Sequence, residues 1–417
     1  MIYVLDIAGR PLMPTERCGK VRRLLRDGRA VCVRRTPFTI RLLYEVPSFV
    51  QDVTLGVDAG SKTIGLSASA ETSELYRSEV ILRNDIVNLI STRKESRRSR
   101  RSRKLRYRAA RFNNRIASRK DGWLAPSVRQ KVDSHIKAID LVCSVLPIKK
   151  IVVEVAKFDT QWIRDPGLTG TDYQHGPQFG FWNVREYVLF RDGHKCQCCH
   201  GKSKDKVLNV HHIESRKTGG DSPDNLITLC ETCHKAYHRG EVELKLKRSF
   251  ASLRDAAAMN ITRWTVYNRL KAEHADKQVR LTYGYLTKHI RIKNGLVKSK
   301  AVDAYCIAGN LKAKTLDELL RGQCVARHSR SLHVFVPTKG NKRRSAIASH
   351  WIGKSRLQRF DTVRYEGKEC LISGSTGGRP YLKNIDWTKA TLSPSVNSKT
   401  IKFLSRKHGS ILYLYFR

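Results

Sequence analysis

The sequence predicts an α/β multidomain protein, and three observations support this fold class. Short runs rich in Val and Ile alternate with amphipathic helical patterns through the middle of the chain. Short strand patterns and turns dominate the first fifty residues and the residues from about 325 onward. One segment carries two Cys-x-x-Cys pairs. With 417 residues, the chain is long enough for two or three compact domains.

Residues 1–50 are expected to form a small β-rich unit. Tyr3–Ile7 and Ala30–Arg34 have strand patterns, and Val21–Arg26 is expected to form a helical turn between them. Residues 52–82 predict a hairpin, because two Val- and Ile-containing strands flank the turn signal Ala59-Gly60. These two strands are Val53–Asp58 and Thr63–Ala68.

Residues 91–120 predict one long basic helix. Fourteen of these thirty residues are Lys or Arg, and Glu95 is their only acidic residue. A thin apolar seam recurs at helical spacing. It consists of Leu105, Ala109, Phe112 and Ile116. A solvated charged helix or a disordered basic arm is the alternative, and the seam argues against disorder.

Further elements follow the basic helix. Residues 128–146 have the stripe of an amphipathic helix, and Lys149–Val155 is expected to be a buried strand that carries Glu154 near its end. Gly167–Gly180 has the composition of a linker, and residues 250–320 are expected to be mostly helical. The residues from about 325 onward predict a small β-barrel-like domain. Its expected strands are Leu332–Val336, Phe360–Tyr365, Leu371–Ile372 and Ile411–Phe416.

The charge of the chain points to a polyanionic partner. The formal net charge is +43 and the pI is about 10.2, so nucleic acid is the expected partner and a basic membrane-surface protein is the alternative. No run approaches the apolar length of a membrane span, and no signal peptide pattern is present. We therefore expect a cytoplasmic protein without a membrane partner. The 11 Cys favour metal binding in a reducing compartment over a disulfide framework.

The two Cys-x-x-Cys pairs predict a structural zinc site. The four cysteines match a tetrahedral Cys₄ set, which lets a module of roughly 50 residues fold around a small core. They are Cys196, Cys199, Cys230 and Cys233. Cys198 is then spare, and the alternative is a set of buried free thiols.

Histidines between and after these pairs predict a second, catalytic metal site. Leu208–His212 has a strand pattern, so the adjacent His211 and His212 are expected to point to opposite sides, one as ligand and one as base. The segment Leu229–His238 is expected to be a helix, on which His234 and His238 are i,i+4 partners that share a face. Asn225 can hold an imidazole in one tautomer. A zinc finger that binds without cutting is the alternative.

Three separate carboxylates are candidates for a two-metal site. Asp58 lies where a strand meets a Gly turn, Glu154 ends a buried strand, and Asp303 opens an apolar helix. Two-metal nucleases need several carboxylates that converge on two cations. No spacing rule joins these three, and a single carboxylate in such a position is more often a turn or cap residue than a metal ligand.

The Cys- and His-containing segment resembles HNH endonucleases. The resemblance implies that His211 binds a divalent metal, that His212 is the general base, that Asn225 orients the base and that His234 is a second metal ligand. His238 is either a third ligand or a solvated helix residue.

The whole chain resembles the IscB family of transposon-encoded, RNA-guided nucleases, compact relatives of the CRISPR effectors. Leu55–Gly65, Ile151–Val155 and Asp303–Ala308 resemble the three RuvC motifs of an RNase H-like fold, and Pro11-Leu-Met-Pro14 resembles the signature of the IscB N-terminal domain. The resemblance implies an RNase H-like (RuvC) domain that is split by an Arg-rich bridge helix and a ββα-metal HNH domain. Small β-rich domains are expected at both ends. It gives Asp58, Glu154 and Asp303 the role of Mg²⁺ (or Mn²⁺) ligands.

The resemblance divides the chain into seven regions. In order they are an N-terminal domain (1–50), RuvC-I (51–90), the bridge helix (91–122), RuvC-II (123–178), the HNH domain (179–247), RuvC-III (248–322) and a C-terminal domain that reads a target-adjacent motif (323–417).

The sequence departs from the family at Lys300. The third RuvC motif usually has a His three residues before the Asp, a His thought to assist water activation, and here that position is Lys300. A protonated Lys cannot act as a base, although it can neutralise phosphate charge. His289 lies upstream, eleven positions before Lys300. The sequence therefore predicts a RuvC site slower than the HNH site.

The implied partners are a guide omega-RNA and double-stranded DNA with an adjacent motif. Arginines on all sides of the basic helix suit contact with the backbone of a guide–target heteroduplex. They are Arg97, Arg98, Arg100, Arg101, Arg103, Arg106, Arg108, Arg111 and Arg115. The C-terminal domain is the expected motif reader. Its candidate contacts are Lys342, Arg343, Arg344, Arg356, Arg359, Arg364 and Arg379.

The predicted function is that of an RNA-guided, metal-dependent DNA endonuclease. HNH is expected to cut the guide-paired strand and RuvC the displaced strand, in a monomeric protein of the prokaryotic cytoplasm that associates with the nucleoid when bound to DNA. One alternative is an RNA-guided nickase or binder with an impaired RuvC site. Another is an RNA-independent, structure-specific endonuclease of the Holliday-junction type, which would leave the basic helix and the HNH insertion unexplained.

Overall fold

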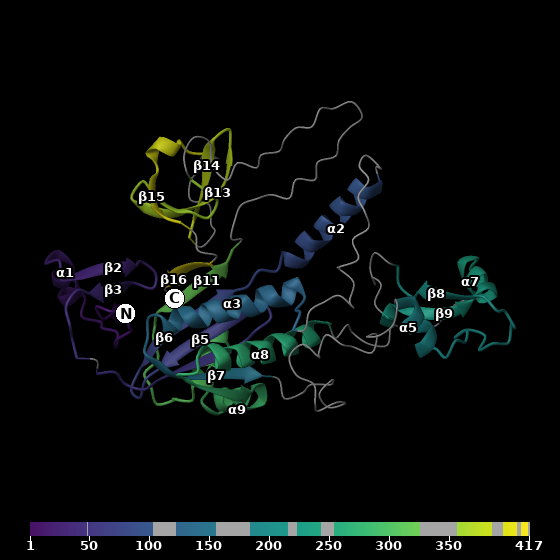
Figure 1. Cartoon of the computed structure of the whole chain (residues 1–417), viewed down its shortest axis with the longest axis horizontal. Helices are drawn as coiled ribbons and strands as arrows, with labels where there is room; N and C mark the ends of the chain where they lie inside the picture. The colour runs from purple at the N-terminus through teal and green to yellow at the C-terminus, as the bar shows by residue number, and fades with distance from the viewer. Residues whose placement is uncertain are drawn as a thin grey trace. The chain divides into compact units, whose positions relative to one another are not determined.

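The chain divides into two compact units. The computed structural model describes residues 1–47, 49–102, 122–155, 184–215, 223–242, 254–325, 357–385, 395–406 and 410–415 (Figure 1). Residues 1–158 and 262–417 form the first unit, and residues 159–261 form the second. Among the described residues, no helix combines the length and the apolar character that crossing a membrane would require.

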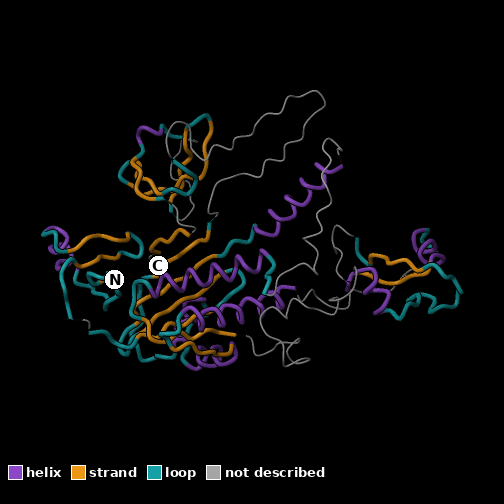
Figure 2. The backbone as a smooth tube through the Cα atoms, in the orientation of Figure 1, coloured by secondary structure: helices purple, strands orange, loops and turns teal. Residues whose placement is uncertain are grey.

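A seven-stranded mixed sheet is the centre of the first unit (Figure 2). Its order is β10 (Gln278–Tyr283), β7 (Ile148–Val155), β4 (Val53–Asp58), β5 (Thr63–Ser69), β6 (Glu74–Ile81), β11 (Leu319–Cys324) and β16 (Ser410–Tyr415). Strands β4, β5 and β6 are joined antiparallel, whereas β7 runs parallel to β4 and β10 runs parallel to β7. The predicted hairpin at residues 52–82 and the predicted strand Lys149–Val155 are confirmed.

Helices cover this sheet. Helix α3 (Pro126–Cys143) confirms the predicted amphipathic helix, because Val132, Ile136 and Ile139 are buried on one face. Helix α8 (Arg254–Glu273) precedes β10, α9 (Gly284–Lys293) follows it, and α10 (Lys300–Ala308) packs on β4 and β5.

Close packing of α10 on the sheet depends on two glycines. A Cβ on Gly56 would lie 2.1 Å from the Ala304 carbonyl oxygen, and one on Gly65 would lie 1.9 Å from the Lys300 carbonyl oxygen. Any larger residue would push the helix away from the strands. Ser299 caps this helix by accepting a hydrogen bond from the backbone N–H of Val302 at 3.1 Å. The helix start, which carries Lys300 and Asp303, is thereby held against the end of β4.

The described part of residues 250–320 is mostly helical, as predicted, but it also contains one strand and the start of another. Gln278–Tyr283 and Leu319–Cys324 are strands β10 and β11 of the central sheet. The first alternates polar and apolar residues with the period of two expected of an edge strand, but it is short and lies between helical patterns.

The N-terminal residues form the predicted small β-rich unit. Strands β1 (Tyr3–Leu5), β2 (Ala30–Arg34) and β3 (Thr39–Leu42) form a sheet in the order β1-β3-β2, with helix α1 (Cys18–Arg26) between β1 and β2 in sequence. Val21 of α1 is buried in the same apolar cluster as Ile40 and Leu42. The helical turn and both strands expected from the sequence are confirmed, although the first strand ends at Leu5.

The C-terminal residues contain a four-stranded antiparallel sheet. Its order is β14 (Arg379–Asn384), β13 (Lys368–Thr376), β12 (Thr362–Tyr365) and β15 (Lys402–Ser405), and a short 3₁₀ turn, Ser398–Thr400, precedes β15. The prediction that Ile411–Phe416 belongs to this domain is wrong, because β16 pairs with β11 at the edge of the central sheet. The predicted strand Leu332–Val336 lies outside the described residues.

The basic helix begins earlier than predicted. Helix α2 comprises Ile86–Ser102, and the predicted apolar seam from Leu105 to Ile116 lies outside the described residues. The linker predicted at Gly167–Gly180 also lies outside them.

The second unit is a small module that contains the Cys and His residues of the predicted metal sites. It contains α5 (Val184–Arg191), the hairpin β8 (Leu208–His212) and β9 (Leu226–Cys230), and α7 (Glu231–His238), with a 3₁₀ turn at Pro223–Asn225. The predicted strand Leu208–His212 is confirmed. The helix predicted to begin at Leu229 begins at Glu231, because Leu229 and Cys230 complete β9 and Cys230 is the N-cap residue.

Candidate functional site: two metal-type clusters and three carboxylates

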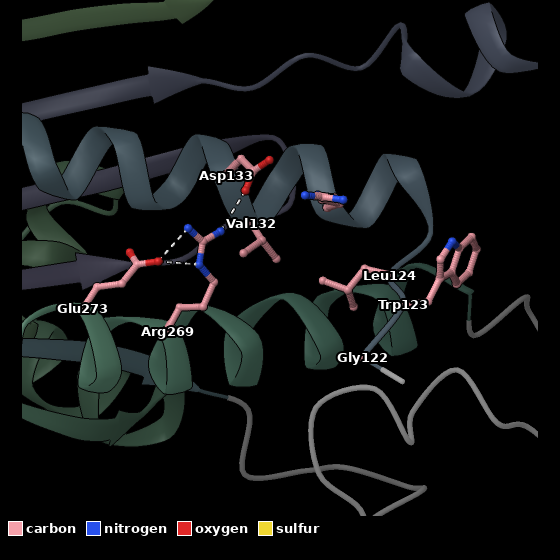
Figure 3. A pocket seen from close by; sticks show the side chains of 8 residues that line it. Gly122, Trp123, Leu124, Val132, Asp133, Arg269 and Glu273 are labelled. Atoms are coloured by element: carbon pink, nitrogen blue, oxygen red, sulfur yellow. Dashed lines mark hydrogen bonds and ion pairs between the residues drawn. The ribbon is translucent and has the colours of Figure 1, made fainter. Parts of the chain in front are cut away.

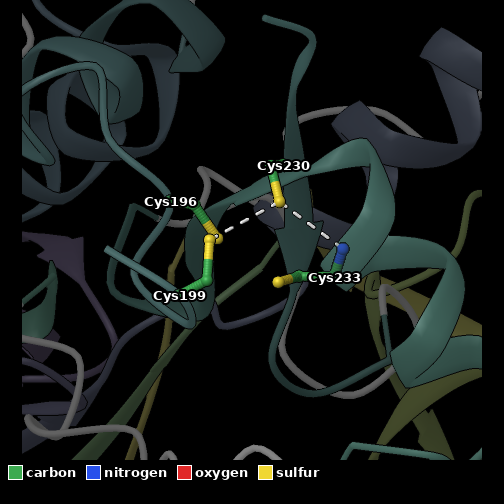
Figure 4. Close-up of side chains that lie close together, drawn as sticks. All are labelled: Cys196, Cys199, Cys230 and Cys233. Atoms are coloured by element: carbon green, nitrogen blue, oxygen red, sulfur yellow. Dashed lines mark hydrogen bonds between the residues drawn. The ribbon is translucent and has the colours of Figure 1, made fainter. Parts of the chain in front are cut away.

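The four predicted cysteines come together in the second unit (Figure 4). Cys196 and Cys199 follow α5, whereas Cys230 and Cys233 flank the start of α7. Their sulfur atoms all lie within 4.8 Å of one another, and Cys199 Sγ is 3.8 Å from Cys230 Sγ. Tetrahedral zinc with Zn–S bonds of about 2.3 Å places its sulfur ligands about 3.8 Å apart. The cluster therefore fits a zinc ion.

Local polar contacts favour a thiolate at one of these positions. The hydroxyl of Ser203 lies 3.3 Å from Cys199 Sγ, and hydrogen bonds from Ser203 lower the pKa of Cys199 to about 5. Burial raises the pKa of Cys196 above its usual range. Burial and the neighbouring thiols raise the pKa of Cys233. Deprotonation of all four thiols this close together is therefore unfavourable by itself, and a bound cation would offset that cost.

Three histidines form a second cluster on the β8–β9–α7 motif. His211 lies on β8, whereas His234 and His238 lie one turn apart on α7. Their ring nitrogens lie within 4.8 Å of one another, and the ring centroids of His234 and His238 are 4.6 Å apart. Tyr237 packs edge-on against His211, with centroids 4.6 Å apart. The structure thus brings His238 to the predicted ligands, and the three imidazoles fit one divalent cation.

The electrostatics suit ligation by neutral imidazoles. Burial, and after it the nearby His234 and His238, lowers the pKa of His211 to about 4. Burial also lowers the pKa of His234, with a further contribution from His238. A neutral imidazole keeps a lone pair for a metal, whereas a protonated one does not. His211 and His234 can therefore act as metal ligands at neutral pH.

His212 and Asn225 lie at the two ends of the connection between β8 and β9. His212 ends β8 opposite Leu226, and the backbone N–H of Ile213 donates to the Asn225 carbonyl oxygen at 2.8 Å. The buried Asn225 amide bonds both backbone groups of Glu214, accepting from its N–H at 2.8 Å and donating to its C=O at 3.0 Å. Asn225 therefore fixes the chain direction immediately after His212.

The three predicted carboxylates belong to elements packed together in the first unit. Asp58 ends β4, Glu154 lies near the end of the neighbouring β7, and Asp303 lies in the first turn of α10. Burial raises the pKa of Glu154 and of Asp303, and in each case the charge of Asp58 raises it further. The negative charge of Asp58 is thus felt by both other carboxylates.

Each of these carboxylates has a basic partner. Lys300 Nζ donates to both oxygens of Asp58, at 3.1 and 2.8 Å. Arg291 Nε lies 2.9 Å from an Asp303 oxygen, and an Arg263 nitrogen lies 3.7 Å from a Glu154 oxygen. Among the described residues, the Cys and His clusters are the groups whose ligand atoms lie within 4.8 Å of one another, and the carboxylates form no such group. As arranged here, the three carboxylates do not converge on one metal ion, and each is engaged by a basic side chain.

Sequence reasoning missed Arg263 and Arg291. Arg263 lies on α8 and also donates through Nε to the Ala59 carbonyl oxygen at 3.1 Å, next to Asp58. Arg291 lies in the last turn of α9. Neither stands at a fixed spacing from its carboxylate, so no local signal could have found them.

The predicted nucleic-acid contacts are only partly described. Arg97 and Arg98 lie on α2 and are exposed. Arg100 and Arg101 also lie on α2, whereas Arg103, Arg106, Arg108, Arg111 and Arg115 lie outside the described residues. Of the candidate motif readers, Arg359, Arg364 and Arg379 are described, and Lys342, Arg343, Arg344 and Arg356 are not.

A surface pocket of about 470 Å³ lies beside α3 and α8 (Figure 3). Arg269 crosses it and pairs with Asp133 and Glu273, each at 2.8 Å. The Arg269 charge is thus neutralised within the protein. Trp123 and Leu124 line the same pocket.

Two family models match the chain. An RRXRR protein model matches residues 2–176, and an HNH endonuclease model matches residues 196–240, which contain the Cys and His clusters. The chain contains an HNH endonuclease domain. The RRXRR region includes the sequence Arg97-Arg98-Ser99-Arg100-Arg101, which has the spacing that this name describes. Nucleic acid is the partner that an endonuclease domain requires, and such domains typically use a divalent metal.

The chain also resembles proteins beyond these models. It is 31% identical over 66 residues to anaredoxin of Nostoc sp. (strain PCC 7120 / SAG 25.82 / UTEX 2576). The aligned residues cover 16% of this chain and 84% of anaredoxin. Over those residues the chain belongs to the same family as anaredoxin, while the rest of the chain lies outside this match.

Among solved structures, two of Streptococcus thermophilus Cas9 are similar to parts of the chain. The AGAA PAM complex matches with 17% identity, a TM-score of 0.28 and coverage of 45% of this chain and 26% of that one. The GGAA PAM complex matches with 16% identity, a TM-score of 0.30 and coverage of 49% and 29%. The chain thus spans 26–29% of the length of these Cas9 chains, and TM-scores this low do not establish a shared fold.

Proposed function

We propose that the chain is an RNA-guided, metal-dependent DNA endonuclease of the IscB type. The HNH domain cuts the DNA strand paired with an omega-RNA guide, and a RuvC-like site at Asp58, Glu154 and Asp303 acts on the displaced strand. The observation that carries the nuclease assignment is the cluster of His211, His234 and His238 on a ββα motif, with His212 next in sequence to the first ligand.

The HNH residues divide the work of hydrolysis. His211, His234 and His238 hold the divalent cation, which when bound supplies Lewis-acid stabilisation to the scissile phosphate. His212 accepts a proton from the attacking water, and Asn225 fixes the loop that positions His212. Cys196, Cys199, Cys230 and Cys233 hold a structural zinc that keeps the module folded.

The order of strands in the first unit supports the RNase H-like part of the proposal. Three antiparallel strands, β6, β5 and β4, continue into the parallel strands β7 and β10, and the first two carboxylates lie on the adjacent β4 and β7. The HNH domain and the basic helix are both insertions between elements of this sheet. The predicted regional boundaries, including RuvC-III at residues 248–322 and the motif-reading domain at 323–417, belong to this proposal.

The charge of the chain supports an RNA partner. A net charge of +43 needs a polyanion, and α2 presents exposed arginines in the region proposed as the bridge helix. A guide RNA paired with DNA is recognised through its backbone, which suits a helix with arginines on several sides.

Sequencing of RNA that co-purifies with the protein, expressed with its flanking DNA, tests the guided part. One dominant species with a constant structured region and a variable end is expected. Heterogeneous RNA that is lost on a high-salt wash would instead mean indiscriminate binding of polyanions. With the guide in hand, cleavage of DNA labelled on each strand separates the two sites. His212→Ala is expected to abolish cutting of the guide-paired strand, and Asp58→Asn cutting of the displaced strand.

A guided nickase is the second candidate, and the Lys300–Asp58 contact favours it. An ammonium group that holds both oxygens of Asp58 competes with any metal for that carboxylate. A nickase would cut only the guide-paired strand in the same assay.

A further inference from the structure

We propose that the ammonium of Lys300 occupies one of the cation positions of the carboxylate site, so that Asp58, Glu154 and Asp303 hold at most one divalent ion. The inference rests on the proposed function only in treating these carboxylates as a cation site. It goes beyond that function because one of the cations at the carboxylates is the Lys300 side chain of the protein itself.

The contact of Lys300 with Asp58 has the form of a ligand contact. Nζ lies 3.1 Å from one oxygen of Asp58 and 2.8 Å from the other, so the ammonium sits between them. The Asp58 side chain is 2% exposed and the Lys300 side chain is 41% exposed, so water reaches this pair only from the side of the lysine. A divalent ion that approached the two oxygens of Asp58 would be repelled by the Lys300 ammonium, which already lies between them.

The backbone around Lys300 holds this position. Lys300 is the first residue of α10, and Ser299 caps the helix just before it. A Cβ on Gly60 would lie 3.3 Å from both Cε and Nζ of Lys300, so the glycine after β4 leaves room for the lysine stem. The backbone N–H of Ala301 donates to Glu79 of β6 at 3.2 Å. The lysine thus approaches Asp58 along a path that the sheet and the helix define.

The other two carboxylates are less fully engaged. The Arg291 Nε and Asp303 Oδ1 atoms are 2.9 Å apart, yet neither has a hydrogen-bond partner within the described part of the chain. The shortest distance between an Arg263 nitrogen and a Glu154 oxygen is 3.7 Å, and Arg263 Nε donates its hydrogen bond to the Ala59 carbonyl oxygen instead. Glu154 and Asp303 are therefore held less firmly than Asp58, which already has a cation with hydrogen-bond geometry.

Counting bound Mn²⁺ tests the proposal without relying on cleavage. The full-length, RNA-free protein carries His211→Ala and His234→Ala, which remove the other divalent site, and free Mn²⁺ is followed by electron paramagnetic resonance during titration. Glu154→Gln together with Asp303→Asn in the same background gives the signal that does not depend on the carboxylate site. We expect at most one Mn²⁺ per chain above that baseline.

Two substitutions of Lys300 decide the outcome. Lys300→Met removes the charge at similar length, and we expect it either to add a second Mn²⁺ or to tighten Mn²⁺ binding at least about tenfold, because the cation–cation repulsion is gone. Lys300→Arg keeps the charge and is expected to bind Mn²⁺ like the parent. Thermal melting of each variant confirms that it is folded, and Lys300→Gln replaces Lys300→Met if the latter is not.

Two results would overturn the proposal: two Mn²⁺ bound above baseline with Lys300 in place, or unchanged Mn²⁺ binding in a folded Lys300→Met variant. Failure of the proposed function is a different observation. A chain that cuts no guided DNA yet shows the expected Mn²⁺ counts would refute guided cleavage and leave the role of Lys300 standing. A chain that cuts both strands while holding two Mn²⁺ would support guided cleavage and refute the proposed role of Lys300.

Discussion

At the scale of single residues, burial of His135 couples folding to pH. Its imidazole on α3 is fully buried, and Nδ1 lies 2.8 Å from the Lys131 carbonyl oxygen. Burial lowers the pKa of His135 from 6.5 to about 4. The unfolded chain therefore binds this proton more readily than the folded chain does. The stabilising effect is complete above the unfolded pKa and is lost as pH falls toward the folded pKa.

We expect this residue to make the free energy of unfolding fall by about 2.5 kcal/mol between about pH 7.5 and about pH 4.5, from the size of its pKa shift. Urea denaturation of the parent and of His135→Leu at both pH values measures the difference. The leucine variant should lose less stability on acidification than the parent. His289→Leu is the matched control, because His289 is exposed. Equal pH dependence in the parent and His135→Leu would contradict the prediction.

The zinc ligands give a second prediction at this scale. Cys230→Ser should abolish the one zinc expected per chain and loosen the HNH domain, because its core has few buried apolar residues beside the cysteines. Zinc content by elemental analysis and protease sensitivity of residues 184–242 measure both effects. Cys198→Ser is the control, since Cys198 is not part of the four-sulfur cluster. Equal zinc loss in both variants would mean that the ligand set is different.

At the scale of elements, the contact between α10 and the sheet sets the position of the carboxylates. Gly56→Ala or Gly65→Ala would place a Cβ about 2 Å from backbone oxygens of α10. We expect each to lower the free energy of unfolding by about 3 kcal/mol or more, because backbone atoms cannot move aside cheaply. Gly19→Ala on α1 is the control, since nothing lies within 4 Å of its Cβ position. Thermal denaturation gives the comparison, and melting points unchanged by all three substitutions would contradict it.

The same elements show what could be predicted from the sequence. The strands β4 and β7, the stripe of α3 and the Cys and His clusters follow from local periodicity or short spacing, because their residues are neighbours along the chain. Strand β10 was missed because an edge strand of six residues leaves only a short alternating pattern. The pairing of β16 with β11 could not be found, since strand partners far apart in sequence leave no local pattern.

The candidate site divides in the same way. Spacing alone predicted the cysteines and the i,i+4 pair on α7, which the structure brings together with His211. The three carboxylates were found through a resemblance, and their roles as metal ligands stay a prediction. Their basic partners could not be predicted, because Lys300 and Asp58 are 242 positions apart and meet only when α10 packs on β4.

At the scale of the whole molecule, the distribution of charge should decide how the chain binds nucleic acid. A net charge of +43 predicts steep salt dependence, because each phosphate contact releases counterions. If α2 lies along a nucleic-acid backbone, replacing the exposed Arg97 and Arg98 with Gln should weaken duplex binding equally for all sequences. It should also reduce the slope of log K against log salt by about 2.

The matched control replaces Arg22 and Arg23 on α1 with Gln. These two arginines are also exposed, so the control removes the same amount of charge. Fluorescence anisotropy of a labelled duplex across a salt series measures both slopes. If binding depended only on total charge, the two double variants would lose the same affinity and show the same slope. A larger change for α2 than for α1 means that the excess charge is placed along a defined path for the phosphate backbone, as a guided nuclease requires. A general affinity for polyanions would require no such placement.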